Sequence, residues 1–452
     1  MASSNVTSTQ PTTGPGSSFV RTQMLEQQAA PLSSTGPIAR LRQRLFSNVP
    51  DTILTLVCLY LLYLIIPAFV QFFFTDAQFT GTDRTACATE AQGGIRPDGW
   101  FAACWAYVGA YANQFVYGFY PDELQWRPNL SALIFFGGLI PLLFPDAPFK
   151  RANILFMLVF APVAILILLT GGNFGVEGLY IPLAIITAIS LLAGYGFAAG
   201  TASDPIPTLK NIAFLFGAIF VLLFVLGIDF GLTRVRTDEW GGLLVTLVVA
   251  VVGIVASLPL GIALALGRRS QMPVVKFASI CFIEFWRGVP LITVLFMASV
   301  MLPFFFPEGV TFDKLMRALI GVALFSSAYM AEVVRGGLQA LPKGQYEGAQ
   351  ALGLNWVQMM RMIILPQALK LVIPGIVNTF IGLFKDTTLV YIVGLFDFLN
   401  IIRTSTTDTT WIMPVQNLTG LSFAAFVYFF FCYAMSRYSM YMERRLDTGH
   451  RS

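Results

Sequence analysis

The chain has 452 residues, of which 56% are hydrophobic and only 12% charged, and its formal net charge is +4. With a mean hydropathy of +0.71, this composition excludes an ordinary water-soluble protein and indicates a chain that crosses a membrane several times. No long block of Lys or Arg indicates nucleic-acid binding. Because lipid offers no partner for backbone N–H and C=O groups, the long apolar runs are expected to be helices. The predicted fold class is therefore an all-α, polytopic transmembrane protein.

The first 37 residues are rich in Ser, Thr, Pro, Gly and Gln and carry almost no charge. We expect residues 1–48 to form a disordered cytoplasmic leader. No apolar core follows a basic start there, so a cleaved signal peptide is not expected.

Ten apolar segments are long enough to cross the hydrocarbon. Five belong to an N-terminal membrane extension, residues 49–235, and five to a core, residues 236–445. When the spans alternate, every flanking basic cluster falls on one side, which the positive-inside rule makes cytoplasmic, so both termini are expected inside. The segments are 52–74, 130–147, 153–170, 179–199, 211–230, 241–266, 288–306, 315–338, 367–390 and 418–440.

An outer loop is expected at 75–129. Its segment 100–120, WFAACWAYVGAYANQFVYGFY, is long enough to cross but carries Asn113, Gln114 and six Trp or Tyr residues. Such a composition suits a helix lying on the outer membrane face. Cys87 and Cys104 fall in the same loop, where a disulfide can form, and the sequence alone does not decide whether they pair.

A compact polar segment, EGAQALGLNWVQMMRMIILP (Glu347–Pro366), interrupts the apolar blocks on the cytoplasmic side. The preceding LPKG should end a helix, and a short helix is expected over 345–352 with Glu347 in its first turn. Its small residues keep one side slim enough to enter a groove on a partner, whereas the alternative is an ordinary loop. Pro366 is expected to open the next span. The candidate docking residues are Gln345, Glu347, Gly348, Ala349, Leu352 and Gly353.

Lys385 and Asp386 stand in the middle of an apolar run. A charge near the bilayer centre costs at least ~2.5–3.5 kcal/mol on insertion scales, so such residues indicate function. They could form an ion pair that seals a helix break, or a substrate site in which Lys385 binds a carboxylate and Asp386 an α-amino group. Asn378 lies seven residues earlier, on about the same helix face.

Two further acid–base pairs have a spacing of three residues, Glu332 with Arg335 and Glu284 with Arg287. Both could simply pair along a helix. After Arg287, the sequence GVP with Pro290 is expected to turn the chain into the membrane.

Several catalytic signatures are absent from the sequence. No GxxxxGKS or GxxxxGKT occurs, so the chain is not expected to hydrolyse ATP. There is no HExxH or GxSxG, and a single His removes the commonest general base, so an enzyme is not expected. No CxxC pair indicates a metal site.

The spacing within Glu347–Pro366 resembles the EAA loop of ABC-importer permeases, although Gly348 stands where that family most often has Ala. Three segments resemble signatures of polar amino-acid permeases of the histidine/glutamate/glutamine/arginine/opine branch. They are FWRGVPLITVLF (285–296), SSAYMAEVVRGGLQALPKGQYEGAQALGL (326–354) and NTFIGLFKDTTLVYIVGL (378–395). The resemblance covers about 236–445. The additional N-terminal spans resemble the larger permease of general L-amino-acid or glutamate/glutamine/aspartate/asparagine transporters.

This resemblance implies a permease subunit of a binding-protein-dependent ABC importer that carries polar L-amino acids across a bacterial inner membrane. It implies a second permease (an unlike one, in view of the long extension), two ATPase subunits that bind ATP and Mg, and a periplasmic amino-acid-binding protein. No cofactor is expected in this chain. Candidate substrate-path residues are Tyr329, Glu332, Asn378, Lys385, Asp386 and Thr388, and candidate structural or interface residues are Glu284, Arg287, Pro290 and Pro366.

Two alternatives differ in mechanism. An ion-coupled secondary transporter would use Lys385 and Asp386 as its coupling pair, and a non-transporting scaffold would use the loop only to recruit a partner. The EAA-like spacing argues against the first, and the intramembrane charges argue against the second.

Overall fold

The computed structural model describes residues 41–446 except 43, 145, 173, 175, 201–204 and 306–312. The first forty residues of the expected leader, and both termini, lie outside the described residues. The chain divides into a first unit that ends at Thr75 and a second that begins at Asp76. The described residues are almost wholly helical, with a single two-residue strand, which confirms the all-α prediction.

The first unit consists of one long helix, α3 (Val49–Val70), continued by a π-helical turn at Gln71–Thr75. The side chain of Asn48 caps it by accepting a 3.0 Å hydrogen bond from the Asp51 amide. The helix is apolar on all sides and buries no residue within its own unit. Such a helix is suited to lipid on every face.

The second unit begins with two short 3-10 turns, Arg84–Ala86 and Glu90–Gln92, followed by helix α4 (Trp105–Tyr117) and a third turn, Asp122–Leu124. A disulfide joins Cys87 to Cys104, which settles the pairing that the sequence left open. Helix α4 fully buries Tyr107 and Phe115 and contacts α10, α18 and α19. The segment is therefore packed against the C-terminal helices of its own chain.

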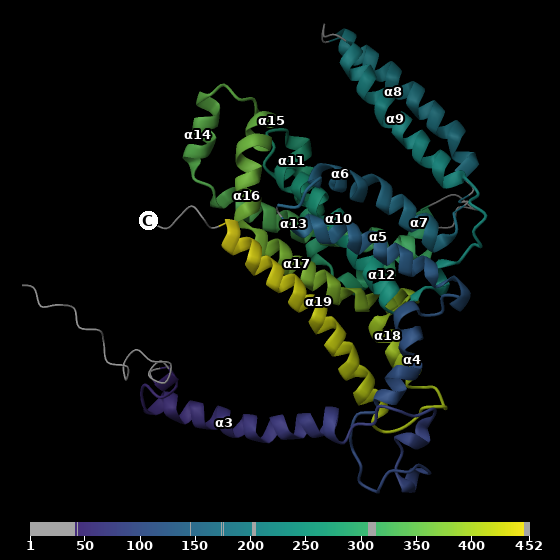
Figure 1. The fold of residues 1–452 in the computed structure, drawn as a ribbon. Coiled ribbons are helices and arrows are strands. Elements are labelled where there is room, and N and C mark those ends of the chain that lie inside the picture. Colours follow the sequence, from purple (N-terminus) through teal and green to yellow (C-terminus); the bar gives the residue numbers. More distant parts are fainter. Residues whose placement is uncertain are drawn as a thin grey trace, which may run out of the picture. The chain divides into compact units, whose positions relative to one another are not determined.

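The remaining N-terminal helices form two groups. In the first, α5 packs against α7, which continues α6 through a π-helical turn at Phe156–Phe160. In the second, α8 and α9 run side by side (Figure 1), joined by the stacked rings of Tyr180 and Phe220. Their bounds are α5 (Trp126–Leu143), α6 (Lys150–Leu155), α7 (Ala161–Thr170), a 3-10 turn (Val176–Leu179), α8 (Tyr180–Gly200) and α9 (Pro205–Gly227).

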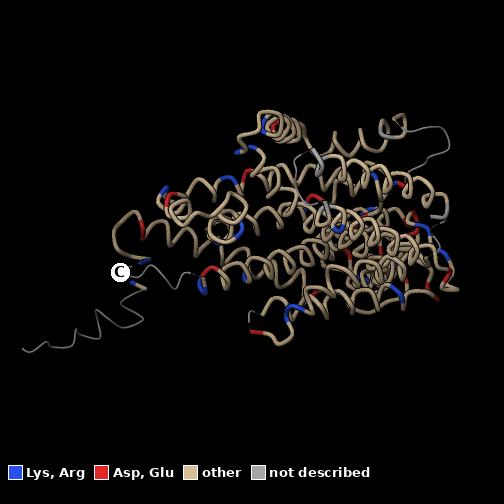
Figure 2. Tube along the Cα trace, turned by 90° about the horizontal axis from the view of Figure 1, so that it is seen from above, with Lys and Arg blue, Asp and Glu red and all other residues tan. Residues whose placement is uncertain are grey.

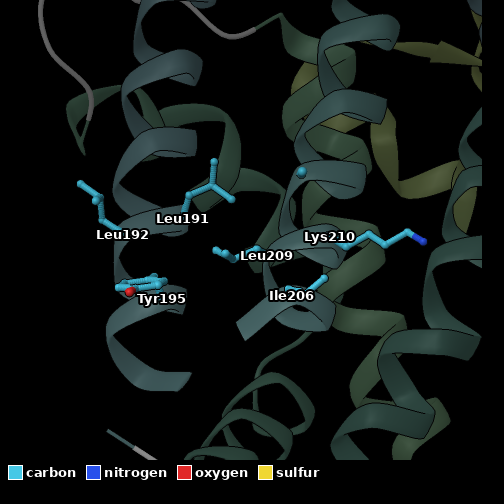
Figure 3. A pocket seen from close by; sticks show the side chains of 7 residues that line it. Leu191, Leu192, Tyr195, Ile206, Leu209 and Lys210 are labelled. Atoms are coloured by element: carbon cyan, nitrogen blue, oxygen red, sulfur yellow. The ribbon is translucent and has the colours of Figure 1, made fainter. Parts of the chain in front are cut away.

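An open apolar groove lies between α8 and α9, lined by Leu191, Leu192, Tyr195, Ile206, Leu209, Lys210 and Ala213. Figure 3 shows that the ammonium of Lys210 points away from the other labelled side chains. The groove itself is thus lined by hydrocarbon, as expected for a helix pair in a bilayer.

The C-terminal half is built around the pair α10 and α13. They approach closely because α10 carries glycines at the contact: a Cβ on Gly261 would come within 2.7 Å of the Met330 side chain. The bounds are a 3-10 turn (Thr237–Glu239), α10 (Gly242–Arg268), α11 (Pro273–Gly288), α12 (Leu291–Val300), a 3-10 turn (Leu302–Phe305) and α13 (Lys314–Ala340).

After α13 the chain forms the loop that bears Glu347 and then returns to the helical core. The bounds are α14 (Lys343–Ala351), α15 (Trp356–Met359), a π-helical turn (Met360–Ile364), α16 (Leu365–Leu371), α17 (Ile373–Asp386), a 3-10 helix (Thr387–Val393), β1 (Phe396–Asp397), α18 (Phe398–Ser405) and α19 (Gln416–Leu446). The short strand forms parallel bridges from Phe396 to Gly241 and from Asp397 to Gly242, at the start of α10.

Eight helices among the described residues are long and apolar enough to cross a membrane, a bent pair α11–α12 could make a ninth, and Tyr180–Gly196 is a shorter apolar helix. Each of the ten predicted spans overlaps one of these. Figure 2 shows that charged residues are sparse along the chain and lie mostly near helix ends. This distribution fits helices whose middles face hydrocarbon.

Two predicted span boundaries were wrong. The seventh span is not the single helix 288–306 but two helices, Pro273–Gly288 and Leu291–Val300, that meet at 103°. Pro290 lies at the bend, where it caps α12 in an extended conformation. The ninth span starts at Ile373 and not at 367, because the helix is broken again at Val372.

Candidate functional site

Helix α14 is the short helix predicted after LPKG, but it starts at Lys343, two residues earlier than expected. Glu347 consequently lies in the second turn, where the helix dipole favours an acid less than it does in the first turn. The turn after the helix follows the prediction. Gly353 has a left-handed φ of 72°, and the amide of Leu354 donates a 3.3 Å hydrogen bond to the carbonyl of Ala349.

The outer surface of this loop is exposed and partly apolar. Gln345, Glu347, Gly348 and Gly353 are exposed. Leu352 is 76% exposed, and just beyond it Trp356 is 50% and Val357 63% exposed. Exposed apolar side chains thus gather on an otherwise polar loop.

Ala349 does not belong to that surface. Its side chain is 2% exposed and packs in a cluster with Met359, Ile364 and Leu338 of the same chain. The expectation that Ala349 enters a partner's groove was therefore wrong: its small size lets α14 lie close to its own helices. Gln345, although exposed, also contacts its own chain: its side-chain oxygen accepts a 3.0 Å hydrogen bond from the side chain of Gln367 on α16.

Pro366 does not open the next span. It is the second residue of α16, which continues directly from the π-helical turn Met360–Ile364. The proline has no N–H to donate, and it is tolerated early in a helix. The membrane span begins after the later break at Val372, with Pro374 near the start of α17.

Helix α17 presents a polar face to its surroundings. Asn378, Lys385 and Asp386 are all exposed, whereas Leu383 and Phe384 are buried. The helix ends at Asp386 and passes into a 3-10 helix, so a helix break does occur here. No ion pair within 4.0 Å joins Lys385 to Asp386 in the part of the chain that is described.

Thr388 caps this break. Its hydroxyl donates a 3.0 Å hydrogen bond to the carbonyl of Lys385, and its own carbonyl accepts a 3.1 Å hydrogen bond from the side-chain Nδ2 of Asn400. Thr388 thus links the carbonyl of Lys385, at the end of α17, to the side chain of Asn400 on α18.

Asp397 and Asn400 are polar residues that sequence reasoning missed. Asp397 is fully buried; its carboxylate accepts hydrogen bonds from the Leu399 amide at 3.0 Å and from the Asn400 side chain. Burial raises the pKa of Asp397 to about 6, although these hydrogen bonds act to lower it. The available signal was an acid directly before a helix and after a glycine turn, a common N-cap pattern.

Glu332 on α13 is the centre of an ion-pair cluster. The predicted pair with Arg335 is present at 2.6 Å, but Glu332 also meets Arg268 at 3.1 Å and Arg287 at 3.8 Å. The expected pair of Glu284 with Arg287 is wrong, because the end of α10 places Arg268 2.8 Å from Glu284.

Tyr329 lies one turn from Glu332 and is 39% exposed, with the Arg287 guanidinium 5.8 Å from its ring centroid. Helices α13 and α17 are in contact. Within the described residues, however, no hydrogen bond or ion pair joins Tyr329 or Glu332 to Lys385 or Asp386. The candidate substrate-path residues therefore form two separate groups in a single chain.

Comparison with known proteins identifies the family. The family described as binding-protein-dependent transport system inner membrane component matches residues 257–448. The inner membrane amino-acid ABC transporter permease protein YhdY of Escherichia coli K12 is 42% identical over 417 residues, which are 92% of this chain and 95% of that protein. The chain belongs to the polar amino-acid ABC importer permeases. Membership favours ABC-type import over ion-coupled transport.

Two more relatives show which members of the family share the N-terminal extension. The glutamate/glutamine/aspartate/asparagine transport system permease protein BztC of Rhodobacter capsulatus is 42% identical to the permease over 446 residues, 96% of this chain and 99% of that protein. The probable glutamine permease GlnP of Bacillus subtilis is 32% identical over 209 residues, 46% of this chain and 92% of that protein. The extension is thus shared with long relatives and absent from a short one.

Proposed function

We propose that this permease carries polar L-amino acids across the inner membrane, with α14 and its exposed surroundings as the surface on which separate ATPase subunits dock. The observation that carries the proposal is the exposure of Leu352, Trp356 and Val357 on one polar loop. Such side chains supply the apolar centre of an interface. Two ATPase copies, holding ATP and Mg, would act on this permease and on an unlike second permease.

The charges of α17 support an amino-acid cargo. Lys385 suits an α-carboxylate and Asp386 an α-ammonium group, and the two are exposed without a mutual ion pair. Because Asn378 lies on the same exposed side, a polar stripe runs along the helix. The long relative BztC is named for glutamate, glutamine, aspartate and asparagine, which supports this substrate class.

We infer the orientation of the chain in the membrane from the basic residues that flank its spans. Placing α14 in the cytoplasm, where ATP is found, also places the Cys87–Cys104 disulfide on the opposite, oxidising side. With both termini cytoplasmic, a periplasmic amino-acid-binding protein would deliver substrate to the side that bears the disulfide.

The test is uptake by the purified complex in liposomes, after mass analysis of its subunits. We expect an ATPase to copurify and ATP-dependent uptake to fall at least tenfold in Lys385→Ala and Asp386→Ala. Lys370→Ala is a matched change of an exposed lysine on α16, before the membrane span that contains α17, and it should leave uptake within twofold of wild type. A complex without an ATPase, or uptake that persists when ATP is replaced by an ion gradient, would contradict the proposal. Unchanged flux in both charge variants would reassign the substrate path.

A further inference from the structure

The end of α10 carries two adjacent arginines, Arg268 and Arg269, whose side chains reach different helices. The Nη1 atom of Arg269 donates hydrogen bonds to the Tyr346 hydroxyl at 2.8 Å and to the carbonyl of Leu338 at 3.1 Å. The Tyr346 hydroxyl in turn donates to the same Leu338 carbonyl at 3.1 Å. Three polar groups from α10, α13 and α14 thus form a closed triangle.

Tyr346 lies on α14 between Gln345 and Glu347, two residues of the proposed docking surface. Unlike them it is half-buried, and its ring centroid lies 5.3 Å from the Arg269 guanidinium carbon. A cation over an aromatic face adds attraction to the hydrogen bond. Any displacement of α14 must therefore move Arg269 or break this contact.

Arg268 connects the end of α10 to α11 and α13. It binds Glu284 of α11 at 2.8 Å and Glu332 of α13 at 3.1 Å. The Glu332 side chain is only 16% exposed, and partly buried ion pairs are screened less by solvent than exposed ones. Arg268 and Arg269 are neighbours in the chain, with Cα atoms about 3.8 Å apart, so the backbone links the two sets of contacts directly.

The cluster continues to a candidate substrate-path residue. Glu332 also faces Arg287 at 3.8 Å, and the Arg287 guanidinium lies 5.8 Å from the ring centroid of Tyr329. A continuous row of contacts thus leads from the docking helix to Tyr329. Its members in order are Tyr346, Arg269, Arg268, Glu332, Arg287 and Tyr329.

We propose that Arg268 and Arg269 are positioning residues that transmit the movement of α14 to the helices carrying Glu332 and Tyr329. The inference rests on the proposed function, since it requires an ATPase docked on α14. A contiguous polar network can carry such coupling only if both ends bias the same element, which has to be shown by measuring the coupling itself. A merely structural role would lower assembly and thermal stability without changing how ATP hydrolysis responds to substrate.

The experiment uses the complete complex in liposomes with the variants Tyr346→Phe, Arg268→Met and their combination. Tyr346→Phe keeps the ring over Arg269 and removes only the hydroxyl, and Arg268→Met removes both ion pairs. We measure basal ATP hydrolysis, its stimulation by the substrate-loaded binding protein, and amino acids carried per ATP. Tyr441→Phe is the matched control, because its hydroxyl also accepts a hydrogen bond from an arginine, Arg445 at 3.1 Å, on α19.

We expect stimulation, measured relative to each variant's own basal hydrolysis, to be at least fivefold lower in each single variant. The loss of stimulation in the double variant should not exceed that in the more severely affected single variant, because both changes interrupt the same path. Tyr441→Phe should behave as wild type. Stimulation within twofold of wild type in both single variants would overturn the proposal, as would additive losses or losses that only follow reduced assembly. Absence of ATP-dependent uptake by wild type would instead overturn the proposed function, so the two failures are distinguishable.

Discussion

The Nη1 atom of Arg127, at the start of α5, donates a 2.6 Å hydrogen bond to the carbonyl oxygen of Thr233, in the segment that leads into α10. The Val235 amide, in the same segment as Thr233, donates a 3.0 Å hydrogen bond to the Thr170 carbonyl at the end of α7. Beside it, the Tyr120 hydroxyl donates a 3.1 Å hydrogen bond to the Leu169 carbonyl of α7. Hydrogen bonds to backbone carbonyls thus attach α5 and α7 to residues 233–235, the last part of the N-terminal extension before the core. The segment between the halves is a packed junction.

Removing Arg127 should destabilise this junction. The side chain is 2% exposed, so Arg127→Ala leaves a cavity and an unpaired Thr233 carbonyl, at a cost of about 2–4 kcal/mol. Arg236→Ala is the control, because Arg236 pairs with Asp238 while its side chain is 74% exposed; it should leave the melting temperature close to that of wild type. Thermal unfolding of the purified complex measures both. Equal stability of the two variants would contradict the role given to Arg127.

The disulfide Cys87–Cys104 should stabilise the segment 76–104 against unfolding. Its two cysteines are 17 residues apart, and closing a loop of this size contributes about 3 kcal/mol in the chain-entropy model. The segment contacts the loop before α19, where the Arg84 amide donates a 3.3 Å hydrogen bond to the Thr410 carbonyl. It also contacts α19 itself, where the Cys104 amide donates a 3.1 Å hydrogen bond to the Thr419 hydroxyl.

We therefore expect a reducing agent to lower the melting temperature and to speed proteolysis between 76 and 104 in the wild type. The double variant Cys87→Ala/Cys104→Ala should melt low in both conditions, and Cys281→Ala, which removes a free cysteine, should still respond to reduction. A wild type whose melting temperature and proteolysis do not change with reductant would be inconsistent with this assignment.

Sequence reasoning placed an apolar helix at each of the ten predicted spans, because long apolar runs have few other uses, but it missed the bend in the seventh span and the later start of the ninth. It located α14 and the Glu332–Arg335 pair, since both depend on neighbours in the sequence. It missed the pairing of Glu284 with Arg268 and the inward packing of Ala349. Both depend on how α10, α11 and α14 meet in space, and a pattern within one helix carries no information about the next helix.

Asp397 should make stability depend on pH. Burial raises its pKa from 3.8 to about 6, so the folded state holds the proton more tightly than the unfolded state does. The contribution of this group to the free energy of unfolding is then largest below about pH 4 and falls as the pH rises through about 6. The full change is on the order of 3 kcal/mol.

The variant Asp397→Asn cannot ionise but keeps one oxygen to accept from the Leu399 amide. We expect wild type to lose stability relative to Asp397→Asn between about pH 4 and pH 7, measured as the difference between their melting temperatures at each pH. A difference that is constant over this range would mean that the carboxyl group titrates normally in the folded protein.

The two small or apolar residues at the end of α14 should respond in opposite ways to substitution. Ala349 is 2% exposed inside the chain's own core, so Ala349→Leu overpacks that contact and should lower permease stability by about 1–3 kcal/mol. Leu352 is 76% exposed, so Leu352→Ser should leave the melting temperature of the isolated permease within about 1 °C, since surface changes rarely exceed 0.5 kcal/mol.

Binding of the purified ATPase to the permease distinguishes the two positions. Leu352→Ser should weaken binding by about tenfold, because an apolar side chain at the centre of an interface contributes about 1–2 kcal/mol. Gln350→Ala, an exposed change on the same helix, is the control for nonspecific effects on α14. If Leu352→Ser binds the ATPase as well as wild type does, the docking surface must lie elsewhere than on the exposed end of α14.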